Sequence, residues 1–148
     1  MQDASSIVML ISGALFIAGV LPIAYERAPA WREADEATFR REFAHTLRSV
    51  DRLQPVLLLI SLAASVAFAI SANGSSRILA LIAAVCFLAI LVGSGVGLVP
   101  IQRRIIDPGS NLSAQEVDRL RTRWLDGHLI RTVVSLAAFV LLVIAAIA

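Results

Sequence analysis

The sequence contains few of the residues that soluble domains place on their surfaces. It has no lysine, and only 16% of its 148 residues are charged. Soluble domains average about 25% charged and roughly 45–50% apolar residues, whereas 58% of this chain is hydrophobic. The composition therefore excludes a soluble globular domain and predicts a protein that resides in the lipid bilayer.

Cysteine and histidine are scarce as well. The single cysteine, Cys86, excludes an intramolecular disulfide. Di-iron bundles need two Glu-x-x-His motifs and two further glutamates, but this chain has one such motif, Glu42-x-x-His45, and two histidines in all. That class of site is excluded. We expect no cofactor, with a haem or a single metal ion held by His45 and His128 as the open alternative.

Four nearly uncharged runs hold most of the hydrophobic residues. They span residues 7–25, 53–72, 78–99 and 129–148. Each run has the roughly 20 residues that an α-helix needs to cross a hydrocarbon core about 30 Å thick. The alternating polarity of membrane β-barrel strands is missing. The sequence predicts an all-α fold, an integral membrane four-helix bundle, as a single domain over residues 1–148.

The arginines are distributed unevenly, which predicts the orientation of the bundle. Six lie in residues 26–52 and five in residues 101–128, accompanied by six and four acidic residues. This mixed charge argues against a nucleic-acid partner. Because basic loops stay in the cytoplasm, we predict a multi-pass cell-membrane protein with both termini outside and loops 26–52 and 101–128 in the cytoplasm. Ala28-Pro29-Ala30 resembles a signal-peptide cleavage site, but Met1-Gln2-Asp3 lacks the basic start that such peptides have.

The first long loop contains a pattern typical of an amphipathic helix. We expect the first span to end near Pro22, and Pro29 to separate its helix from a second one that Asp35 caps. This helix has an apolar and a polar stripe at helical spacing, formed by Phe39, Phe43, Leu47 and Val50 and by Arg41, His45, Arg48 and Arg52. It is expected either to lie on the membrane surface or to continue into the second span, which begins near Pro55.

The sequence of the second long loop, residues 101–128, predicts another short amphipathic helix. We expect the third span to stop at Pro100 and to pack another helix, or a second copy of the chain, against its small residues Ala89, Gly93 and Gly97. Ser113-x-x-Glu116 fits a capping box. After it, one helical face carries Val117, Leu120, Trp124, His128 and Arg131 and runs into the fourth span.

Three motifs resemble those of a known family. Pro100-Ile101-Gln102-Arg103-Arg104 resembles the family pattern of a proline, an apolar residue and an asparagine. Trp124-x-x-x-His128-x-x-Arg131 resembles its Trp, Asn or His, and Arg signature, and Gln54-Pro55 resembles its Asn-Pro. On these residues the chain is similar, over nearly its whole length, to the anthrone oxygenase-like family of small four-helix membrane proteins. Gln102 and Gln54 stand where asparagine is usual.

The resemblance implies an oxidation of flat, apolar, polyketide-like aromatics without a recognised cofactor. Characterised relatives convert anthrones to anthraquinones, for which a base removes a carbon-bound proton and the enolate reacts with oxygen. His128 suits the base and Arg131 the oxyanion partner as catalytic residues. Trp124 suits a stacking platform and Gln102 an orienting group in substrate binding.

Other interpretations stay open. Arg131 lies two residues inside the fourth run, where a charge costs about 2.5–3.5 kcal/mol and marks a functional candidate, but an arginine near a helix end also reaches the headgroups without any function. The protein is then a non-catalytic membrane subunit that packs against a partner protein, a second copy or lipid. Transport is less well supported, because the spans lack the paired ionisable groups of ion-coupled carriers.

Overall fold

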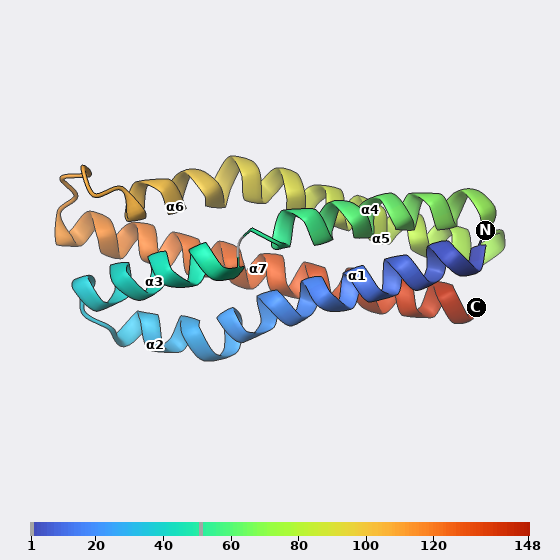
Figure 1. Ribbon diagram of the computed structural model, residues 1–148, viewed down its shortest axis with the longest axis horizontal. Helices are drawn as coiled ribbons and strands as arrows, with labels where there is room; N and C mark the ends of the chain where they lie inside the picture. Colours follow the sequence, from blue (N-terminus) through green and yellow to red (C-terminus); the bar gives the residue numbers. More distant parts are fainter. Residues whose placement is uncertain (1, 51) are drawn as a thin grey trace.

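Helices account for nearly every residue that the computed structural model describes, namely residues 2–50 and 52–148, with side chains described from residue 4 onward except that of residue 50 (Figure 1). The α-helices are α1 (Gln2–Pro22), α2 (Ala28–Glu33), α3 (Glu36–Val50), α4 (Gln54–Ser71), α5 (Gly74–Gly93), α6 (Val99–Ile106) and α7 (Ala114–Ile147). Two π-helical turns, η1 (Ile23–Arg27) and η2 (Ser94–Leu98), join α1 to α2 and α5 to α6. The all-α prediction is confirmed.

These helices form four rods that lie side by side in a long bundle (Figure 1). The rods are α1–η1–α2, α3 followed by α4, α5–η2–α6, and α7. Each contains a helix long and apolar enough to cross a membrane, over Ala4–Glu33, Gln54–Ser71, Gly74–Ile106 and Ala114–Ile147. Both chain ends lie at the same end of the bundle, opposite α2, α3 and α6. The side of the membrane that each end faces stays a prediction.

Two of the expected helix ends are wrong, because the helix continues past both Pro29 and Pro100. A proline lacks the N–H group, and its ring collides with the carbonyl four residues earlier. A π-helical turn precedes each proline and widens the helix there, which makes room for the ring. In both turns an N–H donates to the carbonyl five residues back, from Ala28 to Ile23 and from Val99 to Ser94. The first and third rods therefore extend beyond the predicted spans.

The interior of the bundle has two apolar cores, one at each end. The span core lies among α1, α4, α5 and α7, and its largest members are Met9, Phe16, Phe68, Phe87 and Leu142. The distal core lies among α2, α3, α6 and the first half of α7, and its largest members are Trp31, Phe39, Phe43, Ile105 and Trp124. The two long loops of the sequence are therefore helices that prolong the bundle.

Both alternatives expected for helix α3 are wrong: it neither lies on the membrane surface nor continues into the second span. Phe39 and Phe43 are fully buried in the distal core and Leu47 is 8% exposed, so the apolar face of α3 covers the protein and not the membrane surface. The helix ends at Val50, whose side chain lies outside the described ones, and α4 begins separately at Gln54. The polar stripe of Arg41, His45, Arg48 and Arg52 is exposed, as predicted.

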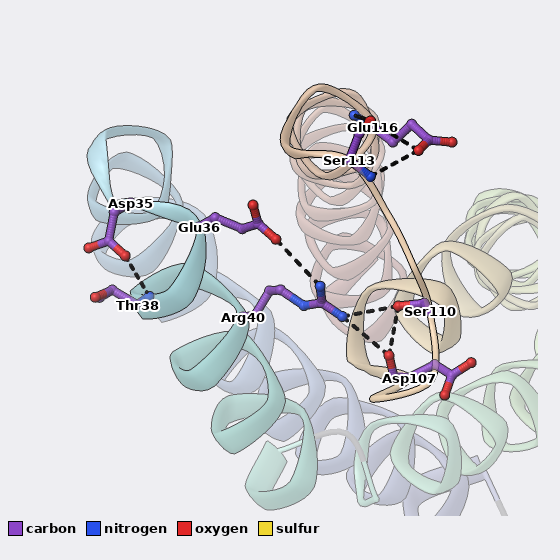
Figure 2. A network of polar contacts seen from close by, with 8 residues as sticks. All are labelled: Asp35, Glu36, Thr38, Arg40, Asp107, Ser110, Ser113 and Glu116. Atoms are coloured by element: carbon purple, nitrogen blue, oxygen red, sulfur yellow. Dashed lines mark hydrogen bonds and ion pairs between the residues drawn. The ribbon is translucent and has the colours of Figure 1, made fainter.

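A network of polar contacts ties α3 to the turn between α6 and α7 (Figure 2). Arg40 donates to the carbonyl of Asp107 at 3.2 Å and to the Ser110 hydroxyl at 3.0 Å. The Asp35 carboxylate caps α3 by accepting the Thr38 N–H at 2.9 Å, and this bond lowers the pKa of Asp35. The predicted capping box of Ser113 and Glu116 at the start of α7 is confirmed.

The small residues of the third rod are not covered by another helix, contrary to the expectation of packing within the chain. Ala89, Gly93 and Gly97 are exposed, and a Cβ added at either glycine meets no atom of the described residues within 4 Å. They line an open groove, described below.

A substitution in the distal core tests whether α3 belongs to the bundle. Phe43→Ala removes a fully buried ring and is expected to lower the free energy of unfolding by about 3–5 kcal/mol. Tyr25→Ala is the control, since Tyr25 is 80% exposed and its loss is expected to matter by less than about 0.5 kcal/mol. Denaturant unfolding in detergent measures both. Equal stabilities of the two variants would show that α3 does not pack as described.

Candidate functional site at the junction of the two cores

A layer of buried polar side chains separates the span core from the distal core. Gln54 begins α4, Gln102 lies in α6, and His128 and Thr132 lie one turn apart in α7. Their exposed fractions are 5%, 6%, 0% and 4%. Burying polar groups is unfavourable unless they find partners, so the contacts of this layer decide whether it is structural or functional.

His128 has a hydrogen-bond partner at both ring nitrogens. Its Nε2 lies 3.2 Å from the carbonyl oxygen of Val20 in α1, and its Nδ1 lies 2.9 Å from a terminal nitrogen of Arg131. A carbonyl can only accept and a guanidinium can only donate. The ring is therefore the neutral tautomer that carries its proton on Nε2, and the lone pair of Nδ1 points to Arg131.

Trp124 holds the His128 ring from one side. The two rings stack nearly parallel, with centroids 4.9 Å apart and planes 12° apart. Phe43 meets Trp124 edge to face at 4.8 Å, and Trp31 lies 6.1 Å from Trp124. Because Trp124 is 1% exposed and already stacked, its position favours support of His128 over direct contact with a substrate.

Arg131 is half-buried and faces a hollow that we call the central cleft. The cleft has a volume of about 210 Å³ and lies between α4 and the α5–η2–α6 rod. Its lining is apolar apart from Arg131, Gln54, Gln102 and Ser94. The cleft therefore presents one cationic and two amide side chains to whatever enters from an apolar environment.

Gln54 carries an acceptor that is not matched within the described part of the chain. Its Oε1 is buried without a hydrogen-bond donor. The amide group occupies the space next to Gly19 where any larger residue would carry its Cβ. Glycine at position 19 is thus what allows α1 and Gln54 to approach so closely. An unmatched carbonyl oxygen beside the cleft is suited to a ligand with a hydroxyl donor.

The structure brings the four predicted site residues together without placing all of them at the cleft. Arg131 and Gln102 line it, His128 lies directly behind Arg131, and Trp124 lies behind His128. Sequence reasoning missed Gly19, Val20, Trp31 and Phe43 as supporting residues. The motifs name only residues of α4, α6 and α7, and nothing in the sequence pairs α1 or α3 with them.

The haem or single-metal alternative through His45 and His128 stays a prediction. His45 is exposed on α3, whereas both nitrogens of His128 have protein partners. Ligation by His128 would require one of these hydrogen bonds to break.

Comparison with known protein families identifies the family to which the chain is related. The family model described as anthrone oxygenase matches residues 43–141. The protein belongs to the anthrone oxygenase family. No curated protein and no solved structure matches the chain.

The part of the chain that matches the anthrone oxygenase family contains the whole polar layer. Gln54, Gln102, His128 and Thr132 all fall within residues 43–141, as do Trp124 and Arg131. Gly19 and Val20, which position this layer from α1, lie outside the match. The family relationship therefore agrees with the resemblance of the sequence motifs, and the geometry adds α1 as a supporting element.

The space beside Gly19 can be tested with a single methyl group. Gly19→Ala is expected to displace the Gln54 amide and to lower the free energy of unfolding by about 1–3 kcal/mol. Gly93→Ala is the matched control: it adds the same methyl group in open space and is expected to be neutral or to stabilise the helix by up to about 1 kcal/mol.

The double variant Gly19→Ala, Gln54→Ala identifies the cause of the expected loss. Without the glutamine side chain the added methyl group has room, so the second substitution is expected to cost less in the Gly19→Ala background than in the parent. Thermal unfolding in detergent gives all four stabilities. Additive effects of the two substitutions would contradict the packing of Gln54 against Gly19.

Proposed function

We propose that this protein is a membrane oxygenase that oxidises a flat, hydroxylated, apolar aromatic of the anthrone class with dioxygen. The observation that carries the proposal is the central cleft, where Arg131, Gln102 and Gln54 face a hollow with an otherwise apolar lining. Membership of the anthrone oxygenase family supports the same reaction.

The polar groups of the cleft suit the oxygen-bearing edge of such a substrate. The guanidinium of Arg131 stabilises a carbonyl oxygen that becomes an enolate, because it donates hydrogen bonds and carries a permanent positive charge. The Oε1 atom of Gln54 accepts a hydrogen bond from a phenolic hydroxyl. The Gln102 amide orients the same edge. The apolar walls, which include Phe16 and Leu58, take the aromatic rings.

His128 supplies the base in this proposal, and Arg131 controls its access. Nδ1 is the basic atom, because Nε2 carries the proton that Val20 accepts. Arg131 covers Nδ1 in the absence of substrate. A substrate oxygen attracts the guanidinium, and the lone pair of Nδ1 then faces the carbon acid. Trp124 keeps the imidazole in place while Arg131 moves.

The chemistry balances with dioxygen as the second substrate. Nδ1 takes a proton from the methylene carbon, and the electron pair of that C–H bond forms the enolate. The enolate reduces dioxygen and forms a carbon-bound peroxide. The proton on Nδ1 passes to the peroxide, which becomes a hydroperoxide. Loss of the second hydrogen of the same carbon as a proton, with cleavage of the O–O bond, gives the new carbonyl and a hydroxide ion, which takes up that proton and leaves as water. One anthrone and one dioxygen thus yield one anthraquinone and one water.

Turnover of an anthrone by purified variants tests the proposal. Arg131→Gln is expected to lower kcat by about 10²–10³-fold, the usual effect of removing an oxyanion donor. His128→Ala is expected to lower it by about 10²–10⁴-fold, the usual contribution of a general base. Oxygen uptake and quinone absorbance measure the rate above that of the enzyme-free reaction. Arg103→Gln, at an exposed position outside the central cleft, is the control and is expected to leave kcat unchanged.

The double variant separates catalysis by His128 from mere positioning of Arg131. If His128 only holds Arg131, adding His128→Ala to Arg131→Gln causes no further loss. If His128 is the base, the double variant is slower than Arg131→Gln alone. Full turnover by folded Arg131→Gln and His128→Ala variants would end the proposal and leave the non-catalytic membrane subunit as the function.

A further inference from the structure

A second hollow, the lateral groove, lies on the other side of the α5–η2–α6 rod, between this rod and α7. It has a volume of about 420 Å³, within the roughly 300–1,000 Å³ that ligand pockets usually have. Gly93 and Gly97 line it, whereas Gly95 lines the central cleft. Gly95 and Gly97 of one π-helical turn thus border different hollows, while Ser94, Leu98 and Arg131 line both.

The lateral groove opens on the lipid-facing surface of the bundle. Ile130, which lines it, is 65% exposed, and its neighbours Val96 and Val133 are 74% and 60% exposed. Such apolar exposure in a spanning helix faces acyl chains. The trough at this surface, where Ala89, Gly93 and Gly97 present no large side chain, must therefore contain part of a lipid or of another apolar chain.

The charge of the groove comes from two arginines of one helix. Arg123 and Arg131 line it on α7, eight residues or about 12 Å apart along the helix axis. No acidic residue lines the groove in the described part of the chain. Asp126 is adjacent in sequence but lies 3.8 Å from Arg32 of α2 in an ion pair. The groove therefore combines an apolar lining, which includes Ala89, Gly93 and Val134, with two cationic side chains spaced along α7.

We propose that the lateral groove binds an acidic phospholipid of the surrounding bilayer. An acyl chain lies along the small residues of α5 and η2, and the phosphate lies between Arg123 and Arg131. The arrangement matches an amphiphile with one anionic end, because a neutral lipid gains nothing from the arginines and a free anion gains nothing from the trough. Basic pockets between membrane helices recognise acidic headgroups in this way.

Native mass spectrometry of the protein from mixed phosphatidylcholine and phosphatidylglycerol bilayers tests this site. The parent protein is expected to retain phosphatidylglycerol preferentially. Arg123→Gln is expected to weaken its retention about fivefold, the effect of one arginine near an acidic headgroup. Gly97→Leu is expected to weaken it by roughly tenfold, since the leucine displaces about two methylene groups of the acyl chain.

Two matched variants control for charge and for volume. Arg103→Gln removes an exposed arginine outside the lateral groove, and Gly95→Leu adds the same side chain as Gly97→Leu on the central-cleft side. Both are expected to retain phosphatidylglycerol like the parent. A Cβ added at Gly95 or at Gly97 meets nothing within 4 Å in the described part of the chain, so both glycine variants start from open space.

Several outcomes would overturn the lipid site. Equal retention of phosphatidylcholine, unchanged retention in Arg123→Gln and Gly97→Leu, or a dimer that only Gly97→Leu dissociates would each contradict it. The measurement needs no turnover, so it is separate from the proposed oxygenase function. Loss of lipid in the groove variants with full anthrone turnover supports both proposals. Preferential lipid retention by a parent protein that oxidises no anthrone supports this site alone, and anthrone turnover by a parent without that preference supports the oxygenase alone.

Discussion

The structure depends on the burial of one imidazole at the level where the apolar spans begin. His128 has no contact with solvent, and a polar ring in that position is tolerated only if the protein itself satisfies both nitrogens. Val20 of the first rod and Arg131 of the fourth do so. Because one partner is a backbone carbonyl and the other a guanidinium, the same two bonds fix the tautomer of the ring and hold Arg131 next to the central cleft.

The distal core encloses the buried imidazole of His128 on the side of the loop helices. Trp124 covers the imidazole, and Phe43 and Trp31 enclose Trp124 in turn, so the loop helices α2 and α3 keep water away from His128. The π-helical turns allow the distal core to form, since they let the first and third rods continue past their prolines. A four-span protein thereby becomes a longer bundle with a polar layer between two apolar cores, and both hollows that border Arg131 lie at that layer.

The periodic features of the sequence were sufficient to predict the spans, the stripes of α3 and the capping box of Ser113, because each depends on neighbours within one helix. The continuation through Pro29 and Pro100 was not predictable, since a proline signals a break and the compensating π turn leaves no mark in the residue types. For the site, one helical face of α7 was enough to group Trp124, His128 and Arg131. Their order relative to the cleft depends on α1 and α3, which meet α7 only in the folded chain.

The nitrogen-15 NMR signals of the His128 ring report directly on its tautomer and on its hydrogen bond to Arg131. In a histidine-labelled His45→Gln variant, His128 is the single remaining histidine, so its two ring nitrogens are observed alone. We expect a protonated Nε2 and an unprotonated Nδ1, and a change at Nδ1 when a hydroxyanthraquinone product draws Arg131 away. A proton on Nδ1, or a ring that does not respond to the bound product, would contradict this expectation.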